Sequence, residues 1–110
     1  MVRTRKELLD EIRSMGGVEK VALISRTGMF IDGDNFEESD TFSAMSAIIL
    51  GAAETASVGV GLVKRVVAHF EDGKKFIVVP AGKKGVLVIL ASEDVYENLK
   101  GIVREFDNLI

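Results

Sequence analysis

Residues 41–61 read TFSAMSAIILGAAETASVGVG, and this stretch decides how we interpret the fold of the chain. Its pattern predicts a helix over 40–58, with Ser39 or Asp40 as the cap and the glycines that follow as the end. Glu54 is the only ionisable residue in the stretch, so apolar or small side chains surround the helix on nearly every side. A surface helix normally keeps one charged face. We therefore expect this helix to be covered on more than one side.

Two rows of side chains of different size run along this helix at helical spacing. The bulkier row, which we expect to pack on the sheet of the same chain, is Met45, Ile48, Ile49 and Ala52. The smaller row would let the backbone of a second copy approach closely, as small residues do where helices cross. This predicted interface between copies consists of Ser43, Ala44, Ala47, Gly51 and Thr55. The alternative is a helix buried inside a monomer, because soluble cores also use alanine and glycine.

The rest of the chain shows ordinary helix and strand signals. Thr4 and Glu7 have capping-box spacing and start a first helix, which the glycine pair at 16–17 ends. Strands are predicted over 18–25, 29–31, 63–70, 75–80 and 86–91. An amphipathic helix is predicted from Ser92, with the apolar stripe Val95, Leu99, Ile102, Val103 and Phe106. The order is α-β-β-α-β-β-β-α in a single domain, 1–110, and the continuous apolar runs of the last two strands indicate a sheet covered on both faces.

The predicted strand over 63–70 lies at a sheet edge if neighbouring strands pair locally. Exposed edges need a partner or protection. Pairing this strand with its copy across a two-fold axis would extend the sheet and set two central helices side by side. We therefore add Lys64, Val66 and Ala68 to the predicted homodimer interface. The alternative is that Lys64 and Arg65 are the charges that keep the edge unpaired.

Composition excludes several kinds of chemistry. The chain has no cysteine, which excludes disulfides, cysteine-bound zinc and thiol nucleophiles. His69 is the only histidine, so no histidine-based metal site or Ser-His pair can be assembled, and we expect a structural role for it. The net charge of −3 argues against nucleic-acid binding. We expect no enzymatic activity, no catalytic residue, no metal and no cofactor.

Three motifs that resemble binding loops do not meet their templates. The acidic residues of 32–40 do not form a calcium loop, because Phe36 and Glu37 occupy positions that a ligand and a glycine would need. We expect a solvated loop whose charge favours the start of the next helix. The glycines of 59–61 and 82–85 lack the strand-then-helix context of phosphate-binding loops, and we expect turns at both places.

The charge pattern gives two further expectations. No signal peptide is recognisable, and the most apolar segment has about ten uninterrupted residues against the roughly 20 that span a bilayer, so we expect a cytoplasmic protein without membrane insertion. Lys64, Arg65, Lys83 and Lys84 are expected at one end of the sheet, as a modest basic rim that steers an acidic partner. The candidate partner-binding residues are Glu54, Arg65, Lys83 and Lys84.

Five segments together resemble the roadblock/dynein light-chain family over nearly the whole chain. They are 8–12 leading to 17–18, 21–28, the small-residue helix 44–56, 86–90, and the pair Asn98-Leu99. The resemblance implies a five-stranded antiparallel sheet, with the first and last helices on one face and the central helix on the other. It also implies dimers joined through the central helix and the strand that follows it. Profilin-like and longin-like domains have a related architecture.

Members of this family act as platforms for small Ras-like GTPases, as GTPase-regulating partners, or as light chains on motor complexes. The resulting hypothesis is a non-enzymatic homodimeric adaptor that binds a Ras-like GTPase and modulates its nucleotide cycle by ordering the GTPase's own switch residues. One alternative is a structural subunit that pairs with a related domain in a larger complex. Another is a small-ligand sensor module.

Overall fold

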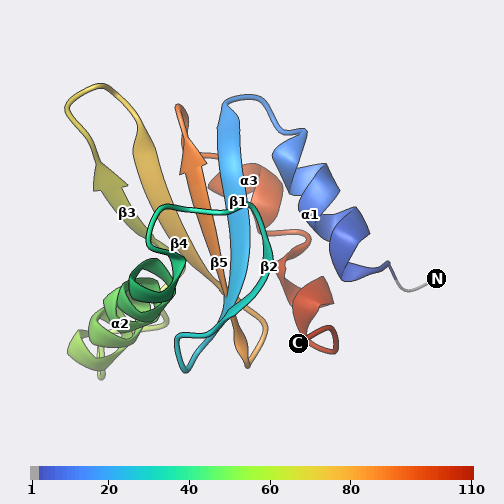
Figure 1. Cartoon of the computed structure of the whole chain (residues 1–110). Coiled ribbons are helices and arrows are strands. Elements are labelled where there is room, and N and C mark those ends of the chain that lie inside the picture. The colour runs from blue at the N-terminus through green and yellow to red at the C-terminus, as the bar shows by residue number, and fades with distance from the viewer. Residues whose placement is uncertain (1–2) are drawn as a thin grey trace.

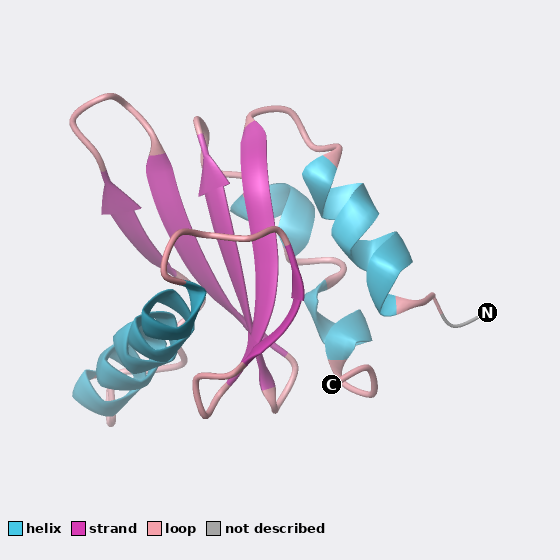
Figure 2. Cartoon of the chain, in the orientation of Figure 1, coloured by secondary structure: helices cyan, strands magenta, loops and turns pink. Residues whose placement is uncertain are grey.

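A mixed α+β fold is seen in the computed structural model, which describes residues 3–110. One antiparallel sheet has the strand order β2-β1-β5-β4-β3 (Figure 1). The elements are α1 (Arg5–Arg13), β1 (Val18–Ser25), β2 (Phe30–Gly33), α2 (Ser39–Ala56), β3 (Val66–His69), β4 (Lys75–Ala81), β5 (Gly85–Ala91), α3 (Tyr96–Leu99) and the 3₁₀ helix η1 (Val103–Phe106). Helices flank both faces of the sheet, with α2 alone on one face (Figure 2). The predicted order and the predicted placement of the helices are confirmed.

The larger core lies between the sheet and the layer formed by α1, α3 and η1. The Thr4 hydroxyl accepts from the Glu7 N–H at 3.1 Å, and the Glu7 carboxylate accepts from the Thr4 N–H at 3.0 Å, so the predicted capping box is present. This cap sets the start of α1, whose inward side chains are fully or almost fully buried. The helical residues at the centre of this core are Leu8, Leu9, Ile12, Leu99 and Phe106.

The smaller core lies between the sheet and α2. Its buried members are Ile24, Leu50, Val78, Val86 and Val88, and the aromatic rings of Phe42 and Phe76 meet edge to face with centroids 5.6 Å apart. Alternate residues of β1, β4 and β5 supply the two cores, so these central strands are apolar on both sides, as expected. A sheet of this kind needs a helical layer on each face.

β3 forms the predicted sheet edge but is shorter than expected. Its pairing with β4 begins at Val66 opposite Val78, and the same register two residues earlier would set Lys64 opposite Pro80. Proline has no N–H to donate to a strand neighbour. Regular pairing of β3 therefore begins only at Val66, and residues 57–65 form turns and coil.

Two predicted helix boundaries are wrong. α2 is preceded by Glu38, which takes a left-handed conformation with φ 51° and gives no side-chain cap, so Ser39 and Asp40 are not caps. Both lie inside the first turn, where the charge of Asp40 still interacts favourably with the helix dipole.

Among residues 3–110, the structure contains no helix whose length and apolar character would let it cross a membrane.

The C-terminal helix predicted from Ser92 is replaced by two short pieces, α3 and η1. Gly101 lies in the turn between them, and glycine in a helix interior costs about 1 kcal/mol relative to alanine. The stripe still faces the core: Val95, Leu99, Ile102 and Phe106 are buried, and Val103 is half-buried. The apolar spacing was interpreted correctly, although the helix is not continuous.

Replacing Gly33 with alanine should destabilise the protein by about 3 kcal/mol or more, because two unfavourable effects combine. Gly33 has φ 116°, and a Cβ there would lie 2.6 Å from the Val21 carbonyl oxygen and 2.8 Å from the Ala22 Cα. Gly73→Ala is the matched control, since φ is 91° but nothing lies within 4 Å of the added Cβ. Chemical denaturation should show a loss of only about 1 kcal/mol for the control. Equal losses would contradict the steric argument.

Candidate functional site

The side of α2 that faces the sheet combines the large side chains of Phe42 and Leu50 with small ones, and the predicted assignment of the two rows is reversed because the bulkier row faces outward. Ser43, Ser46 and Leu50 are the buried residues of the helix. Met45, Ile48 and Ile49 are instead 47%, 57% and 38% exposed, so the prediction that they belong to the core is wrong. The outward row is the bulkier of the two.

The reversal has a physical reason in the packing of α2 against the sheet. The sheet face below α2 is already filled by large aliphatic side chains, among them Ile24, Val78 and Val88. Small residues on the inner side of α2 let the helix backbone come close to these side chains, which keeps the layer densely packed. The Ser43 hydroxyl is buried there with no hydrogen-bond partner among the described residues. The close packing thus leaves one polar atom unsatisfied, a state that is unfavourable in a core.

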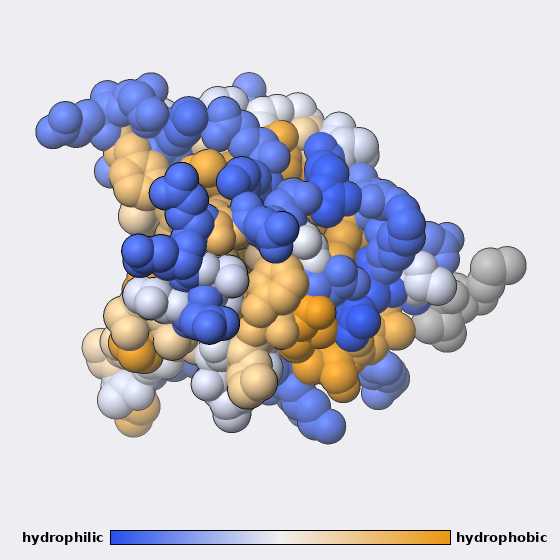
Figure 3. Space-filling model, viewed as in Figure 1, coloured by the Kyte–Doolittle hydropathy of each residue, from blue (hydrophilic) through white to orange (hydrophobic). Residues whose placement is uncertain are grey.

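The outward side of α2 continues into a second exposed apolar segment. Val58, Val60 and Leu62, in the turns and coil after the helix, are large apolar residues exposed to solvent. Apolar residues gather over α2 and this following segment at the lower left of the space-filling view (Figure 3). We call the surface formed by Met45, Ile48, Ile49 and Ala52 the α2 outer face. Contiguous apolar surface of this kind is typical of protein interaction sites.

The small residues predicted to meet a second copy lie in different environments. Ser43 is buried and Ala47 packs on the smaller core, so neither faces outward. Ala44 lies beside Gly28 of the β1–β2 turn, where a Cβ on the glycine would be 3.1 Å from the Ala44 Cα. Gly51 has open space around its Cα, and Thr55 is exposed. The structure places only the last two on or near the α2 outer face.

The predicted interface residues of the edge strand lie on or beside β3. Lys64 and Ala68 are exposed, and Val66 is half-buried against the smaller core. His69 is exposed at the end of β3, so it is not a core residue. The strand edge and the α2 outer face are both available to a partner.

Glu54, the only charged residue in the second half of α2, forms an ion pair with Arg26 of the β1–β2 turn. The backbone N–H of Arg26 also donates to the Lys84 carbonyl at 2.9 Å. Arg26 therefore links the end of α2 to the β4–β5 turn. The sequence reasoning missed this residue, although a lone acid on an apolar helix is a signal for a basic partner elsewhere.

The predicted basic rim is only partly formed. Arg65 pairs with Asp94 at 2.9 Å, and its guanidinium lies 4.5 Å from the ring centroid of Tyr96, so it is held against the α3 segment. The strand register sets Arg65 level with Val79, near the end of β4 that leads to Lys83 and Lys84, but its side chain is engaged by a carboxylate and an aromatic face. The two lysines are exposed in the β4–β5 turn, which confirms a turn at 82–85.

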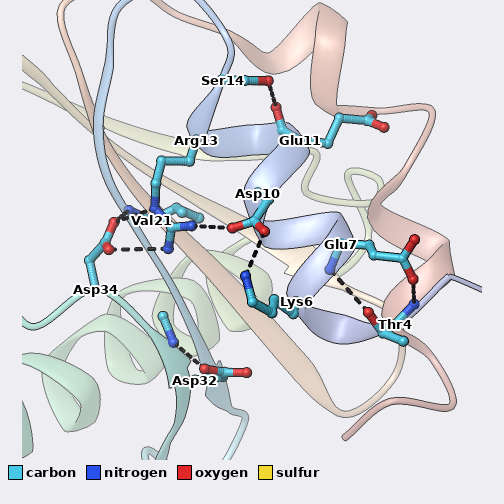
Figure 4. A network of polar contacts seen from close by, with 11 residues as sticks. Thr4, Lys6, Glu7, Asp10, Glu11, Arg13, Ser14, Val21, Asp32 and Asp34 are labelled. Carbon is cyan, nitrogen blue, oxygen red and sulfur yellow. Dashed lines mark hydrogen bonds and ion pairs between the residues drawn. The ribbon is translucent and has the colours of Figure 1, made fainter.

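The acidic residues that precede α2 serve as structural anchors. Asp34 pairs with Arg13 of α1 at 3.1 Å and accepts from the Val21 N–H of β1 at 3.0 Å (Figure 4). Asp32 pairs with Arg5 at 3.3 Å. Within residues 3–110, no three acidic or histidine side chains come together in a geometry that would hold a metal ion.

The Asp34 carboxyl titrates differently from an exposed one. Partial burial by itself raises the pKa of Asp34, but the hydrogen bond from the Val21 N–H and the charge of Arg13 outweigh it, and the pKa lies below its ordinary value. The ionised form is therefore the one that the fold stabilises. This carboxylate fastens the end of β2 to both β1 and α1.

Comparisons with known proteins agree with this architecture. Residues 4–91, from the capping residue of α1 to the end of β5, match the Roadblock/LC7 domain model. The chain therefore belongs to the Roadblock/LC7 domain family, and the resemblance predicted from the sequence is confirmed. A comparison with curated proteins gives no match.

Solved structures share the fold at low sequence identity. A Roadblock/LC7 domain from Streptomyces avermitilis is 16% identical with a TM-score of 0.79, covering 94% of this chain and 95% of that chain. The gliding protein MglB from Thermus thermophilus is 20% identical with a TM-score of 0.79, and the match covers 94% of this chain and 86% of that chain. An MglB with a tetrameric arrangement is 18% identical with a TM-score of 0.75, covering 94% and 85%.

Asp34→Asn should lower the free energy of unfolding at pH 7 by about 1 kcal/mol, because it removes a charged acceptor from Val21 and Arg13. The carboxylate contributes fully above its unfolded pKa of about 3.9, and its contribution is lost as the pH falls below that value. The difference in free energy of unfolding between the variant and the natural protein should therefore shrink as the pH is lowered from 5 to 2, as measured by urea titrations. Glu93→Gln, at an exposed position, is the control and should show no such trend. A difference that stays constant with pH would contradict this role of the ionised Asp34.

Proposed function

We propose that the protein is a non-enzymatic homodimeric adaptor that binds a small Ras-like GTPase and modulates its nucleotide cycle. The observation that carries the proposal is the row of large aliphatic side chains on the α2 outer face, of which Ile48 is the most exposed at 57%. A helix that already packs on its own sheet through Phe42, Leu50 and small residues, and still presents large aliphatic side chains to solvent, is arranged for association.

The energetic argument concerns the burial of this row. Burying one large aliphatic side chain fully is worth about 1.5–3 kcal/mol. α2 packs on the smaller core through its inner side, and its outer row remains uncovered among residues 3–110. Two copies that set their α2 outer faces together would each cover the aliphatic row of the other, as an isologous contact requires.

The edge strand supports the same arrangement. β3 lies at the end of the sheet, and its Val66 packs against the smaller core that α2 covers. A two-fold axis beside β3 would therefore bring both edge strands and both α2 helices together. The interface that we propose retains Gly51, Thr55, Lys64 and Ala68, gives up the inward-facing residues Ser43 and Ala47, and adds the α2 outer face.

Membership of the family supports the proposed GTPase contact. The resemblance to roadblock proteins implies a platform for Ras-like GTPases, and a pair of adjacent helices would offer a composite surface to such a partner. The tetrameric arrangement of one MglB structure supports self-association at a coarse level. In this proposal the chain supplies a surface that orders the switch residues of the GTPase. Lys83 and Lys84 remain candidates for steering an acidic partner.

Ile48→Glu should convert the dimer into a monomer at about 10 µM protein, because each interface would bury two unpaired carboxylates. The measurement is size-exclusion chromatography with light scattering. Asn98→Glu, which adds the same charge at an exposed position of α3 on the opposite face of the sheet, should remain dimeric. A natural protein that is monomeric, or an Ile48→Glu variant that stays dimeric, would reject this interface. Co-purification with a different chain of the same fold would instead support a structural subunit of a larger complex.

The second test concerns the GTPase. A Ras-like GTPase from the same genome should bind the natural protein and change its rate of nucleotide hydrolysis or exchange. Ile48→Glu should abolish this effect, and Asn98→Glu should retain it, in stopped-flow assays with a fluorescent nucleotide. A GTPase whose nucleotide cycle is unchanged by the natural protein would contradict the proposed function while leaving the dimer intact.

A further inference from the structure

A groove of about 740 Å³ lies at the end of the sheet where β4 turns into β5. Its apolar part is formed by Leu62, Pro80 and Val103, with Gly82 between them. Its charged part is formed by Arg26, Lys83, Arg104 and Asp107. These residues come from four separate segments, namely the β1–β2 turn, the coil after α2, the end of β4 with its turn, and η1 with the residue that follows it.

The groove follows from the early end of the β3–β4 pairing. Regular pairing stops at Val66 opposite Val78, so no strand residue covers Pro80 from the side of the edge. The chain passes this point as coil and leaves Leu62 99% exposed. An aliphatic side chain in this position is unfavourable in water and is available to a partner.

The cations of the groove are largely without acidic partners. Among residues 3–110, no carboxylate forms an ion pair with Lys83, Lys84 or Arg104, although most other arginines are paired. Arg26 is paired with Glu54. Asp107 is the one acid of the lining, and its carboxylate accepts from the Lys83 backbone N–H at 2.7 Å.

This local charge contrasts with the net charge of −3 of the whole chain. Glu54 neutralises Arg26 of the lining, which leaves Lys83 and Arg104 against Asp107, and the lysine at 84 in the adjoining turn adds a further cation. A positive site on an acidic protein favours an acidic ligand locally while the rest of the surface repels it, which gives selectivity for a short anionic segment.

We propose that this groove binds an acidic peptide segment of a partner protein, in which an aliphatic side chain is flanked by carboxylates. The aliphatic side chain would cover Leu62, Pro80 and Val103. The carboxylates would meet Lys83 and Arg104, which lie on different segments and so suit charges spaced along an extended chain. Arginine and lysine form their stronger hydrogen bonds with ionised carboxylates.

The groove shares no residue with the α2 outer face, although Leu62 belongs to the apolar segment that continues from it. Val103 and Arg104 belong to η1, which packs with the larger core on the opposite face of the sheet from α2. They also lie beyond residue 91, where the match to the family model ends. A peptide bound here would contact none of the α2 outer-face residues, so the proposed dimer could hold it without separating.

The test uses the full chain and a fluorescein-labelled peptide of eight alternating glutamates and leucines, followed by fluorescence anisotropy in 50 mM salt. The double variant Lys83→Glu with Arg104→Glu should weaken binding about tenfold or more. Lys100→Glu, an exposed charge reversal on the C-terminal side of α3, is the control for one charge reversal outside the groove, to be compared with each single variant as well, and should change affinity less than about twofold. Circular dichroism should show the same fold for both variants.

A second arm separates the apolar contribution from the charge. Leu62→Ser should weaken the binding of the glutamate-leucine peptide about fivefold. It should leave the fold unchanged, because the Leu62 side chain is almost completely exposed. The same substitution should not alter the weaker binding of an eight-glutamate peptide. Equal effects on both peptides would overturn the proposed apolar contact.

The remaining outcomes decide the class of ligand. A peptide of alternating lysines and leucines should not bind, and an eight-nucleotide oligothymidylate should bind more weakly than the glutamate-leucine peptide. Tighter binding of the oligonucleotide would overturn the proposal in favour of a nucleic-acid site. Equal losses in the double variant and the Lys100→Glu control would also overturn it, since binding would then reflect general charge. Because Ile48 is not part of the groove, Ile48→Glu should retain peptide binding even if the dimer is lost.

Discussion

The three central strands, β1, β5 and β4, impose the constraint on which the rest of the structure depends, because they carry apolar side chains on both faces of the sheet. Such a sheet is stable only when both faces are kept from water. One face receives a broad layer made of α1, α3 and η1, whereas the other is covered mainly by α2. The two layers are unequal, and the thinner one is where apolar surface remains outside.

This inequality explains why α2 has so few charges. Its inner side meets a sheet face already filled by large side chains and is therefore built from small residues around Leu50. Its outer side has no counterpart within residues 3–110 and still carries aliphatic residues. The inner side thus stabilises the monomer, and the association that we propose would use the opposite side of the same helix. Substitutions on the two sides would affect different properties.

The sequence was sufficient for the order of elements and the edge position of β3, because these depend on periodicity and on strand neighbours, and the resemblance of five segments was sufficient for the family. It was insufficient for the face of α2, because residue size alone does not say which row meets the sheet when the space beneath the helix is narrow. The break at Gly101 and the pairing of Arg65 with Asp94 were also missed. The pairing depends on a contact between segments far apart in the chain, whereas the break follows from the glycine itself, which the apolar spacing around it does not reveal. The short length of β3, by contrast, is explained by Pro80 once the strand register is known, because this register would set Lys64 opposite a residue without an N–H.

Pro80 has a consequence for the temperature dependence of assembly. Because β3 has only four residues in regular pairing, a sheet continued across two copies would gain few main-chain hydrogen bonds. Association between copies would then depend mainly on the burial of aliphatic side chains. That contribution weakens on cooling, because the hydration of apolar surface becomes less unfavourable at low temperature. A dimer of this design would be held more firmly in warm solution than in the cold, unlike one joined by a long strand.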